Sequence, residues 1–176
     1  MNSPKLTQWG GLAAMLGGLA GMGAGITFNV AAWERAGDAL LPAAYLLTAA
    51  GLAGFHALQK EYYGRIGRGG FYTATIGSLS AVAATTASFV GRVELDLLHA
   101  VGALLLIVGY ILYGVATLRA RMLPAWCGVA FIVVGPVTLF VLGNYSAIGF
   151  GAAWLTLGYA LWLRRDVPDE QSARVS

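Results

Sequence analysis

The side chains of this 176-residue chain that could carry chemistry are few, and the densest group of them lies at residues 94–99. Glu94, Asp96 and His99 combine two carboxylates with an imidazole, and Asp96 and His99, at i and i+3, share one face of a helix. Such a group can bind a divalent cation or a cationic solute. The alternative is that acidic residues simply favour the start of a helix, where the helix dipole is positive.

Further polar residues can join this group if the chain brings its charged loops together. Glu34 and Asp38 form a second acidic segment, and Asn29 precedes Glu34 by about one helical turn. Asn144 lies at the tip of a later hairpin. The ligand-binding cluster that we predict consists of Asn29, Glu34, Glu94, Asp96, His99 and Asn144.

No motif in the sequence indicates catalysis or a bound cofactor. Phosphate loops, Cys-x-x-Cys pairs and His-Glu-x-x-His are absent. His56 and His99 fall near opposite ends of their predicted helices, so they cannot ligate one haem iron from two sides. We therefore expect no catalytic residue, no cofactor and no resident metal.

The elements that position these groups follow from the distribution of charge. Hydrophobic residues make up 58% of the chain and charged residues only 11%, whereas a soluble domain carries about 25% charged residues. A helix needs about 20 apolar residues to cross a bilayer core. The last uncharged run is twice that length and is split at a Gly-Asn step, which favours a turn. We predict an all-α bundle of six transmembrane helices with short loops, at about 6–33, 39–59, 69–91, 97–118, 122–142 and 145–163.

The Lys and Arg residues predict which helix ends face the cytoplasm. With the N-terminus inside, the inner segments hold nine of these residues and the outer loops hold only Arg35 and Arg92. We therefore expect both termini in the cytoplasm, a location in the cell (inner or plasma) membrane, and a disordered tail at 164–176. The net charge of +3 reflects this bias toward anionic lipid, so no nucleic-acid partner is expected.

Small residues recur at every fourth position in the first and third predicted helices. This spacing lets helix backbones approach closely, where van der Waals contact stabilises membrane bundles. The contact can form within the bundle, with a second copy or with another membrane protein. The predicted packing residues are Gly17, Gly21, Gly25, Gly70, Ala74 and Ser78.

Prolines and hydroxyl groups add further expectations. Pro136 cannot donate to the carbonyl of Ile132 and predicts a helix kink, with Thr138 as one candidate partner for that carbonyl. Pro42 falls near the start of its predicted helix, where a missing N–H costs nothing. The span 69–91 carries seven Ser and Thr residues, and we expect the other helices to enclose it.

The segment Leu118–Gly128, Leu-Arg-Ala-Arg-Met-Leu-Pro-Ala-Trp-Cys-Gly, resembles a joint between helices in small multi-pass membrane proteins of high-GC bacteria, mostly without assigned function. The resemblance implies a bacterial inner-membrane protein and carries no catalytic residue across. In size and helix count the chain is also similar to the substrate-binding subunits of energy-coupling-factor transporters, without a shared substrate motif.

Three functions fit these features. The first is a non-catalytic subunit or packing partner in a membrane protein assembly, motivated by the small-residue rows. The second is a small-solute binding or transport protein with an outward-facing polar entrance, walled by the helices at 69–91 and 122–142. The third is a membrane-embedded enzyme acting on a lipid or isoprenoid, which requires the predicted polar cluster to converge on one pocket.

Overall fold

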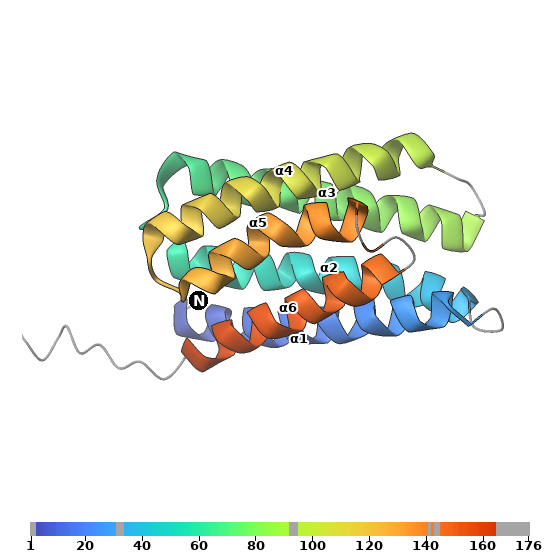
Figure 1. The fold of residues 1–176 in the computed structure, drawn as a ribbon, viewed down its shortest axis with the longest axis horizontal. Coiled ribbons are helices and arrows are strands. Elements are labelled where there is room, and N and C mark those ends of the chain that lie inside the picture. The colour runs from blue at the N-terminus through green and yellow to red at the C-terminus, as the bar shows by residue number, and fades with distance from the viewer. Residues whose placement is uncertain (1–2, 31–33, 92–94, 141, 143–144, 165–176) are drawn as a thin grey trace, which may run out of the picture.

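Six helices form the described part of the chain (Figure 1). The computed structural model describes residues 3–30, 34–91, 95–140, 142 and 145–164. The helices are α1 (Ser3–Phe28), α2 (Glu34–Gln59), α3 (Gly64–Gly91), α4 (Asp96–Ala120), α5 (Ala125–Phe140) and α6 (Ser146–Leu163). The prediction of an all-helical chain with six helices is confirmed. The predicted tail, apart from Arg164, lies outside the described residues.

Five of these helices are long and apolar enough to cross a membrane, and α5 is the shorter one. It spans 16 residues, whereas the sequence predicted a helix at 122–142. Its start is delayed because Pro124 disfavours helical geometry at the residue before it. The helix therefore begins only at Ala125 and ends at Phe140.

Helix α2 departs from the prediction in the opposite direction, because it begins at Glu34 and not near residue 39. A helix can continue beyond its apolar segment through charged residues that lie in water. An uncharged run therefore marks only the apolar part of the helix and not its ends. Pro42 consequently lies inside α2, and the prediction that it occupies the helix start is wrong. A proline there has no N–H to donate, so it leaves the carbonyl of Asp38 without its usual helical partner.

Large apolar side chains cover the outward faces of all six helices. A soluble bundle would place polar residues on those faces, so this surface is suited to contact with lipid. One example from each helix in turn is Leu19, Leu46, Ile76, Leu104, Val133 and Tyr159, each between 44% and 62% exposed.

The helices follow one another around the bundle, but the last hairpin is splayed. Helix α1 packs against α2 and α6, while α3 packs against α4 and α2. Although a short loop joins α5 to α6, α5 lies chiefly along α4 and α6 chiefly along α1 (Figure 1). The two helices make little contact with each other, and this separation creates the space described below.

Helix α3 lies at the edge of the bundle, so the prediction that other helices enclose it is wrong. Its main contacts are with α4 and α2, and Tyr72 and Ile76 are exposed. Three of the hydroxyl groups that motivated the prediction bond to their own helix: Thr75, Thr85 and Ser88 donate to the carbonyls of Phe71, Ala81 and Ala84 at 2.7–3.0 Å. Such internal bonds let a polar helix face lipid without another helix as partner.

The small-residue rows face neighbouring helices of the same chain. A methyl carbon added at Gly17 would lie 2.9 Å from Thr48 of α2, and one at Gly70 would lie 2.6 Å from Tyr113 of α4. Those approaches leave room for hydrogen only. The remaining positions are Gly21 and Gly25, which lie against Gly151 and Ile148 of α6, and Ala74 and Ser78, which are fully buried.

A candidate solute cavity at the acidic end

The bundle has two ends of opposite chemical character. The C-terminal ends of α1, α3 and α5 lie at one end, which we call the acidic end because Asp38 and Asp96 are found there (Figure 1). The other end holds both ends of the described chain and is called the basic end (Figure 1). Its exposed cations include Lys5, Lys60, Arg65, Arg68, Arg119, Arg121 and Arg164.

Three ionisable side chains line one recess at the acidic end. Asp38 comes from α2, and Asp96 and His99 come from the first turn of α4. The hydroxyl-bearing residues Thr85 and Ser88 of α3 complete its polar wall. We call this space, about 210 Å³ in volume, the acidic recess. It lies where the three consecutive helices α2, α3 and α4 meet, so its polar side chains do not all belong to one helix start.

The predicted ligand-binding cluster is thus formed in part. Asp96 and His99 line the acidic recess, where Asp38 joins them. Asn29 instead donates from its amide to the carbonyl of Gly25 at 2.8 Å, at the end of α1. The side chains of Glu34, Glu94 and Asn144 lie outside the described residues. Among the residues that are described, no group of three or more His, Cys, Asp or Glu side chains could hold a metal ion.

A larger cavity extends from the recess into the bundle. It has a volume of about 310 Å³ and is bounded by α1, α2, α4, α5 and α6. His99 lies at its mouth and Tyr110 at its depth; both are on α4, eleven residues or about 16 Å apart along the helix. Leu41 and His99 line both spaces, so the cavity and the acidic recess adjoin. We call the larger space the aromatic cavity.

The aromatic cavity exists because the last hairpin is short as well as splayed. The 16 residues of α5 span about 24 Å, whereas the 25 residues of α4 span about 37 Å. Both helices meet the same loop at the basic end, so the first turns of α4 reach beyond α5 (Figure 1). The space between α5 and α6 stays open because the residues that face it are small: Gly135 on α5, and Ser146 and Ala147 on α6.

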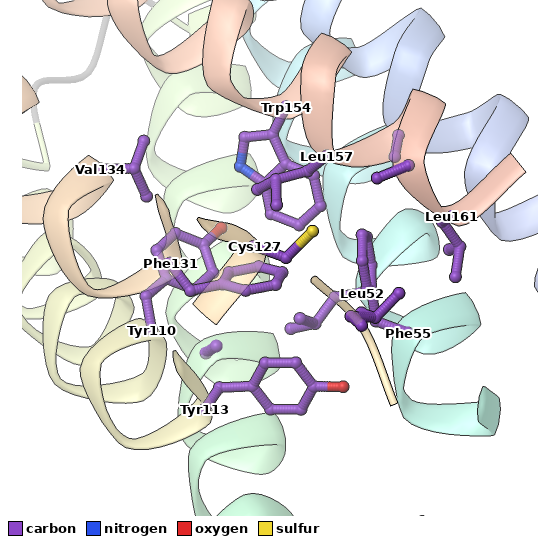
Figure 2. Packing of buried hydrophobic residues seen from close by; sticks show 14 of the residues in the cluster. Leu52, Phe55, Tyr110, Tyr113, Cys127, Phe131, Val134, Trp154, Leu157 and Leu161 are labelled. Carbon is purple, nitrogen blue, oxygen red and sulfur yellow. The ribbon is translucent and has the colours of Figure 1, made fainter. Parts of the chain in front are cut away.

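Aromatic rings form the deep part of the cavity and continue into the core. Phe150 of α6 lies 5.8 Å from the ring of Tyr45 and is stacked 6.5 Å from that of Tyr110, measured between ring centroids. Beyond them, Trp154 lies 5.8 Å from Tyr110, and Phe131 lies 5.8 Å from Trp154. Figure 2 shows the rings of Tyr110, Phe131 and Trp154 packed together. The rings below the cavity are therefore closely packed, and they form its floor.

Three polar groups near this floor lie beside one another without forming a hydrogen bond of good geometry. They are the hydroxyl groups of Tyr110 and Ser78 and the indole N–H of Trp154, all fully buried. Figure 2 shows the Tyr110 hydroxyl and the Trp154 nitrogen turned toward each other. An unsatisfied buried polar group costs about 1–3 kcal/mol, so groups of this kind are typical of places where a small adjustment or a bound molecule supplies the partner.

The proline of α5 does not recruit the partner that the sequence suggested. Thr138 also lines the cavity, but its hydroxyl donates to the carbonyls of Val134 at 2.6 Å and Gly135 at 3.0 Å, and not to that of Ile132. A threonine in a helix reaches the carbonyl three or four residues earlier, which excludes Ile132 at six residues. Pro136 lies inside α5, and the kink expected there stays a prediction.

His56 lies at the basic end, far from His99, as the sequence indicated. Its Nδ1 is hydrogen-bonded to the hydroxyl of Tyr63, and its ring is stacked on Phe71 with 4.1 Å between ring centroids. Burial raises the pKa of Tyr63 to about 12, so that phenol keeps its proton at neutral pH and can donate to the imidazole. This arrangement closes the turn between α2 and α3 and does not form part of the cavity.

The polar and charged residues of the sequence did not point to the aromatic part of the site, namely Tyr45, Tyr110 and Phe150. Aromatic residues of membrane proteins are expected chiefly near helix ends, where they mark the membrane interface. A tyrosine in the middle of an apolar run, such as Tyr110 in 97–118, needs a partner for its hydroxyl group. That requirement was the signal available for finding this region.

Comparison of the chain with protein-family models, curated proteins and solved structures finds no match. The resemblance of Leu118–Gly128 to bacterial multi-pass proteins therefore stays a prediction, and function has to be argued from the cavity itself.

Proposed function

We propose that the protein is a membrane-embedded binding protein for a small organic solute, which occupies the aromatic cavity and enters through the acidic end. The observation that carries the proposal is a cavity of about 310 Å³ whose mouth is polar and whose depth is aromatic. Small-molecule sites in proteins share this combination of apolar walls and a few placed polar groups. Binding could serve passage across the membrane or delivery to a partner.

In this proposal the chain crosses the membrane six times, with both termini in the cytoplasm and the acidic end outside. The bias of Lys and Arg toward the basic end supports that orientation. Helix α5 crosses despite its shortness, because α6 must return to the basic end where α1 begins. A solute outside the cell would then meet the acidic recess first.

The structure gives less support to a role as a subunit that packs through its small-residue rows. Those rows motivated the hypothesis, but they lie against other helices of the same chain. The outward faces carry large apolar side chains that suit lipid equally well. Binding of a partner protein stays a prediction, because no surface of the described helices is assigned to it.

The proposal is tested by filling the cavity. Ala103 of α4 lines the cavity and is half-buried, so Ala103→Phe places a phenyl group inside it. Ala100, one turn earlier, is exposed, and Ala100→Phe is the matched control. Each protein is purified from native membranes in mild detergent, and small molecules released on denaturation are measured by mass spectrometry.

We expect one or more non-lipid compounds to be released by the parent protein and by Ala100→Phe and to be lost from Ala103→Phe. Thermal unfolding of both variants checks that each is folded. If all three proteins release the same compounds, or the parent releases only bulk lipid, the cavity does not bind a solute and the proposal is wrong.

A further inference from the structure

The residues that line the two adjoining spaces indicate the charge of the solute. The aromatic cavity offers apolar walls, and the acidic recess beside its mouth offers two carboxylates. We propose that the solute is a lipophilic organic cation, an amine or quaternary ammonium compound with an aromatic or aliphatic body. This inference rests on the proposed function and names its substrate class.

The carboxylates of the recess are free to pair with a ligand. Asp38 approaches from α2 and Asp96 from α4, so they flank the space from two sides. Within the described part of the chain, neither forms a hydrogen bond or an ion pair, and no Lys or Arg is among the residues that line either space. The lining of the recess therefore carries net negative charge among the described residues.

The cation nearest to Asp38 along the described chain is Arg35, three residues earlier on α2, and it does not line the recess. A small metal ion is a poorer fit than an organic cation, because no three His, Cys, Asp or Glu side chains among the described residues are placed so that they could hold one. An anionic solute would be repelled by both carboxylates.

The rings of the cavity favour the same class of solute independently of the carboxylates. The faces of Tyr45, Tyr110 and Phe150 carry negative charge density, which attracts organic cations at close range. Tyr110, 1% exposed, also lines the cavity, and its hydroxyl forms no hydrogen bond of good geometry with Ser78 or Trp154, the two polar groups beside it. Apolar contact and cation attraction thus act along one path from mouth to floor.

The test compares two probes of equal shape that differ only in charge. Benzyltrimethylammonium carries a quaternary nitrogen, and neopentylbenzene carries carbon at the same place. Binding of each is measured by equilibrium dialysis to the protein in lipid nanodiscs, with empty nanodiscs subtracted. We expect the cation to bind at least about tenfold more tightly, the ratio that one exposed ion pair and one cation–π contact together supply.

Variants then locate the charge effect. The double variant Asp38→Asn, Asp96→Asn removes the ion pair and keeps the cation–π contact, so it should weaken binding of the cation about two- to fivefold and leave the neutral probe unchanged. Glu61→Gln, an exposed residue in the loop at the basic end, removes one carboxylate elsewhere and should change neither affinity.

Each remaining outcome decides between the two proposals. Equal binding of both probes to the parent protein would overturn the cation inference and leave the solute cavity standing, and this comparison needs no variant. An unchanged cation affinity in the double variant would also overturn the inference. If neither probe binds the parent protein, the cation inference is wrong; the proposed cavity stands or fails separately, by whether Ala103→Phe loses its released compounds.

Discussion

The contact between Gly10 of α1 and Gly54 of α2 offers a sharp test of the packing. A methyl carbon built on Gly54 would lie only 2.6 Å from the Cα of Gly10, and one built on Gly10 would fall on the backbone of Gly54. Neither obstacle is a side chain that can rotate away. We therefore predict that Gly10→Ala forces α1 and α2 apart.

The size of the effect follows from two opposing terms. Overpacking of a tight contact costs about 1–3 kcal/mol, while alanine favours a helix over glycine by about 0.8–1 kcal/mol. The matched control is Gly69→Ala in α3, where an added methyl carbon meets no atom within 4 Å. The control gains the helix term without the clash, so the two variants should differ in unfolding free energy by about 1–3 kcal/mol.

The assay is reversible unfolding in mixed micelles, followed by tryptophan fluorescence and circular dichroism. Gly10→Ala should unfold at a lower fraction of sodium dodecyl sulfate than the parent, and Gly69→Ala at the same or a higher one. If both variants unfold together, α1 and α2 do not meet at these glycines. If Gly10→Ala changes the oligomeric state and not the stability, these glycines lie at an interface between two copies of the chain instead.

Two further predictions concern the basic end and the orientation. The folded chain holds the Tyr63 proton up to a pKa of about 12, whereas the unfolded chain releases it near pH 10, so this residue contributes stability that is lost as the pH rises from about 10 to 12. The unfolding temperature of Tyr63→Phe should therefore fall less between about pH 10 and 12 than that of the parent. An equal fall in both proteins would show that Tyr63 is not buried. In a Cys127→Ala background, a membrane-impermeant maleimide added to intact cells should label Arg35→Cys and not Lys60→Cys. The reverse pattern would invert the orientation.

The sequence predicted the number of helices well because charge marks where a membrane helix must stop. It placed α4 and α6 within two residues of their observed bounds, and the end of α1 and the start of α3 each differ by five. It misplaced the start of α2, because the uncharged run begins only after Asp38, whereas the helix already begins at Glu34. For α5 the run was longer than the helix, since Pro124 and the turn after Phe140 are themselves uncharged.

The candidate site was only partly predictable, since it depends on how the helices are placed around one another. Asp96 and His99 could be identified from their spacing, and they do line the acidic recess. The aromatic cavity depends on α5 and α6 lying apart, and no local pattern encodes that separation. The prediction that α3 lies inside the bundle failed for a related reason: its hydroxyl groups suggested a polar path, whereas those of Thr75, Thr85 and Ser88 bond to their own helix.

The central claim is that a small molecule occupies the space between α1, α2, α4, α5 and α6. The most direct measurement is an experimental density map of the protein purified from native membranes, at a resolution that shows side chains. The account predicts non-protein density extending from His99 toward Tyr110, with Asp38 and Asp96 beside its outer end. A bundle in which α5 and α6 close against each other and side chains fill the space would contradict it.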